Sequence, residues 1–274
     1  MQNIRRHRNL VATTSPAFEM HSNSFRDNMP AKIIESKLYN AECTKTMRTF
    51  TEDSIDCIIT DPPYNLGLFM QNRNTNLKKM RANQFAYAGW DNLEFEEWQR
   101  NMRLWLLECH RVLKKKGTLI IFMAVIKVGE VIKLAEEAGF YYKTTGIWHK
   151  TNPMPRNMQI QFVNSTECWL YFIKDGTSGT FHNNGKVQHD FIESSVCPLS
   201  EKKFGKHPTQ KPLSIMRHLI EILTNPNDII LDPFMGSGST CVAAEQLGRR
   251  YLGIELNKGY YDIAKARVKD IKHL

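Results

Sequence analysis

The sequence predicts an α/β domain in which a mostly parallel β-sheet carries helices on both faces. From about Ile33 onward, short β-rich runs alternate with amphipathic helical patterns, and one run passes through a glycine-rich turn directly into a helix. This alternation is typical of parallel strands joined by crossover helices. A chain of 274 residues with 42% hydrophobic residues suits one large domain or two small ones and is ample for a sizeable core.

Seven short runs rich in β-branched and aromatic residues are expected to be strands: 38–42, 55–60, 118–123, 142–150, 167–174, 228–232 and 250–255. Over 95–113, apolar residues recur at three- and four-residue steps, which indicates a helix packed on a sheet. Four further helices are expected: about 127–138, which stops at Gly139; one with Pro212 in its first turn; 239–247, before Gly248; and one that closes the chain.

Three segments show no regular pattern. Residues 1–30 are polar and aperiodic, so we expect a flexible basic arm, followed by a single domain over 31–274. The stretches 65–92 and 175–207 are basic and rich in Asn, Gly or Ser. Loops of this length in a compact domain are usually functional or disordered, so both are candidates for a functional role.

The charge of the chain favours a polyanionic partner. The formal net charge is +9, and the basic residues gather in three segments that are expected to be loops or tail: Arg5, Arg6 and Arg8; Arg73, Lys78, Lys79 and Arg81; and Lys202, Lys203 and Lys206. This placement favours nucleic acid over a charge that serves only solubility.

The cysteines and the apolar runs point to an ordinary intracellular protein. Six cysteines are widely dispersed, without a CxxC pair or zinc-ligand spacing, so we expect reduced thiols in the core and no metal. No apolar stretch approaches the roughly 20 residues of a membrane span, and the N-terminal residues lack the apolar segment of a secretory signal. A cytoplasmic location without membrane contact is expected.

The stretch DIILDPFMGSGSTCVAAEQLG (228–248) predicts a ligand site at the end of a strand. Gly236 and Gly238 permit a tight turn, and the free N–H groups of the helix start favour an anionic group. A diphosphate is disfavoured, because the Gly-Lys-Ser/Thr of a Walker loop and the last glycine of a dinucleotide fingerprint are missing. Glu255 ends the next strand, where an acid accepts hydrogen bonds from ribose hydroxyls. A ribose and an amino acid without diphosphate describe S-adenosylmethionine. The alternatives are a plain turn, and a Glu255 that only caps the last helix.

Three motifs together resemble the amino-group DNA methyltransferases, which methylate N6 of adenine or N4 of cytosine. They are DPPY (61–64), KHPTQKPL (206–213) and DPFMGSGST (232–240), in this order. The order is similar to the beta arrangement of that family, which implies a circularly permuted S-adenosylmethionine-dependent methyltransferase fold, a Rossmann-like sheet. The resemblance covers about residues 35–272. KTNPMPRN (150–157) and NSTE (164–167) resemble a segment of small bacterial adenine methyltransferases of restriction-modification systems.

The resemblance implies a catalytic role for Asp61, Pro62, Pro63 and Tyr64. The exocyclic amine of adenine is a poor nucleophile, because its lone pair is delocalised into the ring. The carboxylate of Asp61 and the main-chain carbonyl of Pro62 can each accept one of its N–H groups, and the two prolines keep these acceptors aimed. A base must leave the duplex to react, and Tyr64 offers a face on which the flipped ring can stack.

The resemblance also implies residues for the cofactor and for DNA. The expected cofactor residues are Asp232, Phe234, Gly236, Ser237, Gly238, Ser239 and Thr240 of the glycine loop, Glu255 on the ribose, Lys211 and Thr209 of HPTQKP, and Glu42 at the end of the first strand. Lys211 pairs with the cofactor carboxylate or fixes the loop in this interpretation, and Glu42 stands where relatives often carry Asp, so a plain surface role is an open alternative. The expected DNA contacts are Asn65, the flap over 65–92 with Arg73, Lys78, Lys79 and Arg81 on phosphates and Phe69 or Tyr87 near bases, Arg156, and a small target-recognition insertion at about 175–205.

The sequence therefore predicts a bacterial, site-specific DNA methyltransferase that transfers a methyl group from S-adenosylmethionine to N6 of adenine. N4 of cytosine stays open as the target, because DPPY is more typical of adenine enzymes and SPPY of cytosine enzymes without a strict division. A regulator that binds cofactor and nucleic acid without catalysis, and an NAD-dependent oxidoreductase, are the alternatives from other classes. DNA is the expected partner, and the resemblance allows a homodimer and a cognate restriction endonuclease.

Overall fold

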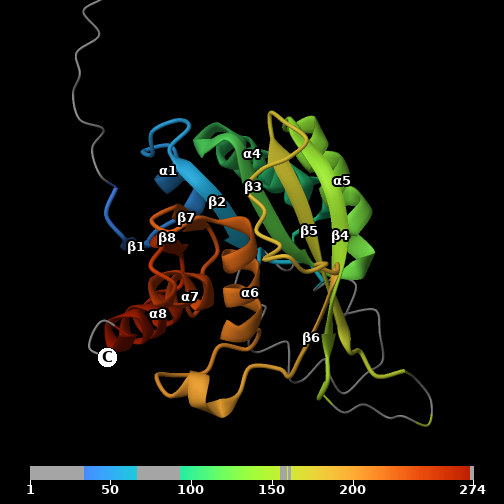
Figure 1. The fold of residues 1–274 in the computed structure, drawn as a ribbon, viewed down its shortest axis with the longest axis vertical. Helices are drawn as coiled ribbons and strands as arrows, with labels where there is room; N and C mark the ends of the chain where they lie inside the picture. Colours follow the sequence, from blue (N-terminus) through green and yellow to red (C-terminus); the bar gives the residue numbers. More distant parts are fainter. Residues whose placement is uncertain (1–33, 67–92, 155–158, 160–161, 272–274) are drawn as a thin grey trace, which may run out of the picture. The chain divides into compact units, whose positions relative to one another are not determined.

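The computed structural model describes residues 34–66, 93–154, 159 and 162–271. Their strands form one eight-stranded sheet in the order β1-β8-β7-β2-β3-β5-β4-β6 (Figure 1). The bounds are β1 Lys37–Asn40, β2 Ile55–Thr60, β3 Leu113–Met123, β4 Phe140–Lys150, β5 Thr166–Lys174, β6 Phe191–Ser194, β7 Ile229–Asp232 and β8 Arg250–Glu255. Only β5 among them is antiparallel to its neighbours, so the carboxyl ends of the other seven strands meet at one edge.

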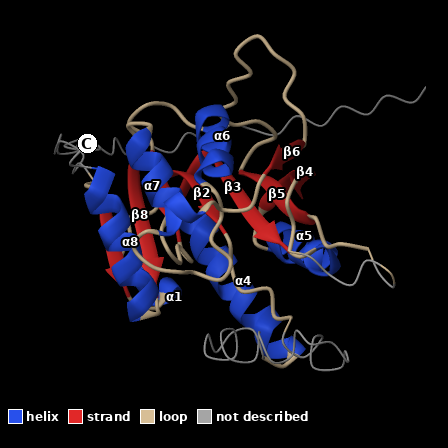
Figure 2. Ribbon diagram, turned by 90° about the horizontal axis from the view of Figure 1, so that it is seen from below, coloured by secondary structure: helices blue, strands red, loops and turns tan. Residues whose placement is uncertain are grey.

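Helices cover both faces of this sheet, which gives three layers (Figure 2). The helices are α1 Cys43–Met47, α4 Phe95–Val112, α5 Val128–Glu137, α6 Leu213–Leu223, α7 Ser239–Gln246 and α8 Lys258–Ile271, with short 3-10 turns at Val125–Lys127 and Leu199–Lys202. One core cluster joins α1, α4 and α5 to the first face. A second cluster joins α6, α7 and α8 to the other face. The predicted fold class, a mostly parallel sheet with helices on both faces, is confirmed.

The alternation of side chains along the strands explains the two clusters. In β2, Ile58 belongs to the first cluster, whereas Cys57 and Ile59 belong to the second. In β3, Leu119 and Ile121 likewise face away from Ile120 and Phe122. A strand buried on both faces shows a continuous apolar run, and this is the pattern that marked these segments as strands in the sequence.

Several predicted element bounds need correction. β3 begins at Leu113, five residues before the predicted start, and follows α4 without a loop. Pro212 is the N-cap residue of α6 and does not belong to its first turn. The predicted bounds of β2 and β8 agree with the structure.

Two elements lay outside the prediction. β6 lies in the stretch 175–207, for which no regular element was expected. Its four residues pair in parallel with the end of β4 at the margin of the sheet, a contact that a run of only four residues does not reveal. The five-residue helix α1 was also unexpected, and it is held by Glu42, whose carboxylate caps its first turn.

The expectations for residues 1–33 and 67–92 lie outside the described residues. All six cysteines are buried free thiols, as expected. Within the described part of the chain, no helix is long and apolar enough to cross a bilayer. The same residues contain no group of three His, Cys, Asp or Glu side chains placed to hold a metal ion.

Candidate active site and cofactor site

The residues singled out by the motifs gather at the carboxyl edge of the parallel strands. Asp61 directly follows β2, Asp232 ends β7, and Glu255 ends β8. These three strands are neighbours in the sheet, so residues far apart in the sequence lie side by side. A buried hydrogen bond of 2.8 Å from Thr60 Oγ1 to Asp232 Oδ1 links the first two directly. The strand order therefore brings the DPPY segment and the glycine loop to one place, where α/β sheets usually bind ligands.

The carboxylate of Asp61 is held from two sides. Its Oδ1 accepts a hydrogen bond from the Tyr64 hydroxyl, and its Oδ2 accepts one from Lys211 Nζ. Burial raises the pKa of Asp61, while the Lys211 ammonium acts in the opposite direction. Burial and the charge of Asp61 raise the pKa of Tyr64, so its hydroxyl stays a donor. The structure thus brings Asp61, Tyr64 and Lys211 together, as a side-chain cluster centred on one acid.

Lys211 also approaches a second acid, Glu167, which sequence reasoning did not single out. Lys211 Nζ lies 3.2 Å from Glu167 Oε2, and the other oxygen of Glu167 pairs with Lys150. Glu167 lies in β5 and Lys150 ends β4, two antiparallel neighbours whose register places them on a diagonal. The available signal was a charged residue in each of two apolar strands, within the segments 150–157 and 164–167 that resembled the family.

The glycine loop has the geometry that the motif predicted. Gly236 has φ of 51° and Gly238 has φ of 79°, a left-handed conformation that L side chains rarely adopt. A Cβ on Gly236 would lie 2.9 Å from Nε2 of His207, so the imidazole packs directly against the loop. The backbone N–H of Gly236 donates to Glu255 Oε2 at 3.0 Å, and the N–H of Asn257 donates to Glu255 Oε1 at 2.7 Å. Each oxygen keeps a second lone pair for a ribose hydroxyl.

Asp232 is buried under the loop and has an unusual pKa. Its Oδ1 accepts hydrogen bonds from Thr60 Oγ1 and, at 3.1 Å, from the backbone N–H of Phe234. Burial nevertheless raises the pKa of Asp232 to about 7. A buried carboxylate with this pKa lacks a cationic partner, and an ammonium group of a ligand would supply one.

Two residues that were not predicted as site residues contact the glycine loop. Arg267 of α8 is buried, and its Nη1 donates to the carbonyl of Ser237 at 2.7 Å and lies 3.2 Å from Ser239 Oγ. The hydroxyl of Ser239 donates in turn to the carbonyl of Lys211 at 2.8 Å. His207 is the second, with its Nδ1 buried and without a hydrogen-bond partner among the described residues. Burial lowers the pKa of His207 to about 4, so its ring is neutral at pH 7.

Other predicted site residues occupy mixed positions. The carboxylate of Glu42 accepts hydrogen bonds from the backbone N–H groups of Thr44 and Lys45, so it caps α1. Thr209 is exposed, and Phe234 packs edge-on against Trp105 with ring centroids 5.5 Å apart. Thr240 is buried at the start of α7, with its hydroxyl 3.5 Å from the carbonyl of Ile59. The cofactor contacts expected of these residues, of Lys211 and of the glycine loop stay predictions.

Asn65 closes the base of the segment that was expected to be a flap. It is buried with φ of 51°, its Nδ2 donates to the carbonyl of Leu93, and its Oδ1 accepts from the N–H of Leu93, both at 3.0 Å. The two ends of the segment are thus tied together, and the contact of Asn65 with DNA stays a prediction. Arg73, Lys78, Lys79, Arg81 and Arg156, together with Phe69 and Tyr87, lie outside the described residues.

The donor set fits S-adenosylmethionine. Glu255 offers acceptors for two ribose hydroxyls, and the buried Asp232 offers a counter-charge for the ammonium of an amino acid. A Cβ at Gly238 would lie 2.8 Å from the Cβ of Ala264, so the loop has the close packing that glycine alone permits. The described residues of this site therefore suit a ribose and an amino acid better than a diphosphate.

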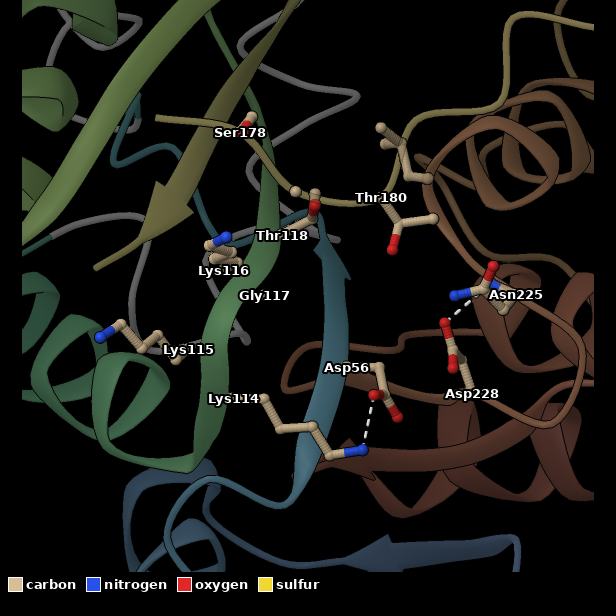
Figure 3. Close-up of a pocket in the computed structure, with 12 residues that line it drawn as sticks. Asp56, Lys114, Lys115, Lys116, Gly117, Thr118, Ser178, Thr180, Asn225 and Asp228 are labelled. Carbon is tan, nitrogen blue, oxygen red and sulfur yellow. Dashed lines mark hydrogen bonds and ion pairs between the residues drawn. The ribbon is translucent and has the colours of Figure 1, made fainter. Parts of the chain in front are cut away.

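A separate pocket of about 400 Å³ lies at the opposite edge of the sheet (Figure 3). It is lined by the start of β3 and by two turns, and Lys114 pairs there with Asp56 at 2.6 Å. In Figure 3 the side chain of Lys115 points away from the other labelled residues. Ser178, Gly179 and Thr180, at the start of the predicted target-recognition insertion, line this pocket, whereas Asp61, Asp232 and Glu255 lie at the other ends of their strands.

The family model of the N6/N4 methyltransferases, described as DNA methylase, matches residues 55–266, which is more than half of the chain. The chain belongs to this DNA methylase family. Type II methyltransferase M.HinfI of Haemophilus influenzae is 33% identical over 253 residues, which cover 86% of this chain and 68% of that protein. Type II methyltransferase M2.DpnII of Streptococcus pneumoniae is 33% identical over 242 residues, which cover 85% of this chain and 89% of that protein.

Solved structures of DNA methylases share the fold. The M1.HpyAVI complex with S-adenosylmethionine matches with a TM-score of 0.62 and 28% identity, over 85% of this chain and 98% of that one. The cytosine-N4-specific PvuII DNA methyltransferase matches with a TM-score of 0.69 and 19% identity, over 88% of this chain and 92% of that one, which shows the fold alone. The predicted methyltransferase fold and the S-adenosylmethionine dependence are confirmed: the chain is a DNA methyltransferase that uses this cofactor.

Proposed function

We propose that this DNA methyltransferase acts on N6 of an adenine that is flipped out of the duplex at a specific site. The observation that carries the proposal is the position of Asp61 beside the glycine loop, with Tyr64 and Lys211 fixing its carboxylate. An acid at this place can accept an N–H of an amine that enters next to the cofactor. DPPY favours adenine, and N4 of cytosine is the competing target. The likeness to the PvuII enzyme does not decide between them, because at 19% identity it concerns the fold alone.

The chemistry expected of the chain is orientation and acceptance of a proton. The cofactor supplies an electrophilic methyl group on a sulfonium. Asp61 and the carbonyl of Pro62 orient the two N–H groups of the amine so that its lone pair points at that methyl group. Asp61 accepts the proton that the nitrogen loses. Tyr64 stacks on the flipped base, and Glu255 and Asp232 hold the ribose and the ammonium of the cofactor.

The partners and segments follow from the same proposal. DNA binds across the carboxyl edge, with 65–92 as a flap over the base and about 175–205 as the target-recognition insertion. The two relatives named above are type II methyltransferases, which supports a role beside a cognate restriction endonuclease in bacteria. A homodimer is proposed by resemblance to the family.

The test is transfer of a labelled methyl group from S-adenosylmethionine to DNA, followed by digestion to nucleosides. We expect N6-methyladenine, and N4-methylcytosine as the sole product would overturn the choice of base. Sequencing of modified bases across a genome, with and without the enzyme, would give the recognition site.

The matched variant for this test is Asp61→Asn, which keeps the shape of the side chain and removes its charge. The rate of methyl transfer should fall by about 10²–10⁴-fold, the range for loss of a general base. DNA affinity should change by no more than about threefold, because phosphate contacts carry most of it. Full activity in this variant would contradict the assigned role of Asp61.

A further inference from the structure

Both carboxylate oxygens of Asp61 already have a partner. The Tyr64 hydroxyl donates to Oδ1, and the Lys211 ammonium donates to Oδ2. Under the proposed function, the same carboxylate must accept an N–H of the target amine. In a buried site an ammonium is the stronger donor, since it carries a full charge and is poorly screened. Each oxygen of Asp61 keeps a second lone pair, but an ammonium in contact draws on the negative charge that the amine needs. The amine therefore binds more strongly, and Asp61 accepts its proton more readily, if Lys211 has another acceptor to move toward.

Glu167 provides that acceptor. Its Oε2 lies 3.2 Å from Lys211 Nζ and is buried, and no hydrogen bond of good geometry reaches it within the described part of the chain. Its Oε1 is paired with Lys150. Lys211 thus stands between two carboxylates and is fully engaged with only one. A small movement of the ammonium would exchange one partner for the other.

Two aromatic rings flank the Lys211 ammonium in this buried place. The Lys211 ammonium lies 5.8 Å from the ring centroid of Tyr64 and 5.2 Å from that of Phe122. The side chain of Lys211 is 6% exposed, so water does not compete strongly for it. The two carboxylates are balanced by two ammonium groups, which makes the cluster neutral as a whole and tolerable in a buried place.

We propose that Glu167 is a positioning residue: it takes over the Lys211 ammonium when the target amine binds to Asp61, and Lys150 holds Glu167 in place for this exchange. The inference rests on the proposed role of Asp61. No covalent bond changes in this step. The exchange leaves Asp61 with its charge available to orient the amine and to accept its proton.

The charges around Asp61 predict a signature in the pH profile. The titratable groups that face it in the described structure are Tyr64 on its own segment, Lys211 before α6, Glu167 in β5 and Asp232 in β7. Burial raises the pKa of Asp61, Lys211 lowers it, and Glu167 raises it. Methyl transfer requires the ionised carboxylate, so the rate falls as the pH drops through this pKa.

Two substitutions should move that pKa in opposite directions. Glu167→Gln removes a repelling charge and leaves Lys211 on Asp61 alone, so the pKa of Asp61 should fall and the acidic limb should move to lower pH. Lys150→Met leaves the charge of Glu167 uncompensated and draws Lys211 toward it. The pKa of Asp61 should then rise, and the acidic limb should move to higher pH.

The experiment measures single-turnover methyl transfer from pH 5.5 to 9, with saturating DNA and S-adenosylmethionine. Glu167→Gln should slow transfer by about tenfold or more at pH 7.5, while its Kd for DNA stays close to that of the wild type. Glu167→Asp keeps the charge and should therefore retain part of the wild-type rate. Its acidic limb should lie near that of the wild type. Glu137→Gln, which removes a carboxylate from an exposed ion pair with Arg103, is the control and should change neither quantity.

The inference would be overturned if the acidic limb of the pH–rate profile stays at its wild-type position in both Glu167→Gln and Lys150→Met. It would also be overturned if the limb moves in the same direction in both variants. If Glu167→Gln does not fold, the limb of Lys150→Met and that of Glu167→Asp decide in the same way. Full activity of Asp61→Asn would instead refute the proposed role of Asp61, so the two failures can be told apart.

Discussion

Two acids of this site have raised pKa values, which a cation or a hydrogen-bond donor of a ligand would lower. Asp232 has a pKa of about 7, because it is buried and its neighbours are neutral donors. Burial also raises the pKa of Glu255, although the backbone N–H groups of Gly236, Leu256 and Asn257 act against it. Both acids lie at strand ends, where the sequence predicted cofactor contacts. Such shifts are common where a fold gives up stability for binding.

Replacing Asp232 with Asn should stabilise the protein without cofactor and weaken cofactor binding. The pKa of Asp232 is raised from 3.8 to about 7 on folding, so the folded state holds this proton more tightly than the unfolded chain does. Below pH 3.8, the Asp232 carboxyl therefore does not lower the free energy of unfolding. Between pH 3.8 and 7 it lowers this free energy progressively, and above pH 7 the loss stays constant. At pH 8 the free energy of unfolding of Asp232→Asn should exceed that of the wild type by on the order of 1–3 kcal/mol.

Thermal unfolding of both proteins at several pH values between 5.5 and 8 measures this difference. The gap in Tm should widen with pH, and titration calorimetry should show weaker binding of S-adenosylmethionine to the variant. A gap that narrows as the pH rises would show that Asp232 is ionised in the folded protein at low pH, against this account.

At the scale of elements, the site depends on how α7 and α8 hold the glycine loop. Gly238 is the N-cap residue of α7 and packs on Ala264 of α8, while Arg267 of α8 donates to the carbonyl of Ser237. Gly248 lies just beyond the other end of α7 and also has a positive φ, of 67°. A Cβ added at Gly248 would meet nothing within 4 Å. Comparing alanine substitutions at Gly238 and Gly248 therefore distinguishes the effect of backbone strain from that of a steric clash.

Gly248→Ala should lower the free energy of unfolding by roughly 1–2 kcal/mol, which is the strain of one left-handed residue. Gly238→Ala should cost more, because a Cβ would also lie 2.8 Å from that of Ala264 and push α8 away from the loop. Unfolding in urea gives both values, and cofactor affinity should fall only in the Gly238 variant. If Gly238→Ala and Gly248→Ala lower the free energy of unfolding equally and bind the cofactor equally well, α8 does not set the shape of the loop.

For the whole molecule, the net charge of +9 should govern DNA binding. If Arg73, Lys78, Lys79, Arg81 and Arg156 each contact one phosphate, the plot of log Kd against log salt should have a slope of about 4.5. Replacing the four flap residues with Gln should reduce that slope to about 1. Lys115→Gln with Lys116→Gln, at the opposite edge of the sheet, is the matched control.

Fluorescence anisotropy of a labelled duplex at several salt concentrations measures these slopes. The control should keep the slope of the wild type, and cofactor binding should be the same in all three proteins. A slope that falls in the control but not in the flap variant would place DNA at the other edge of the sheet.

The sequence by itself determined the fold class and the bounds of β2 and β8, and it placed the DPPY and glycine-loop motifs next to strand ends. These features are local: apolar runs of strand length, glycines at positions with positive φ, and acids at strand ends can be identified within a few residues. Only the tertiary structure decided the rest. Lys211 and Asp61 are 150 residues apart in the sequence, and Glu167, Lys150 and Arg267 join the site through strand pairing and helix packing. The pairing of β6 with β4 was likewise decided by the tertiary structure. Such contacts leave no periodic pattern, because their partners are set by the order of the strands in the sheet.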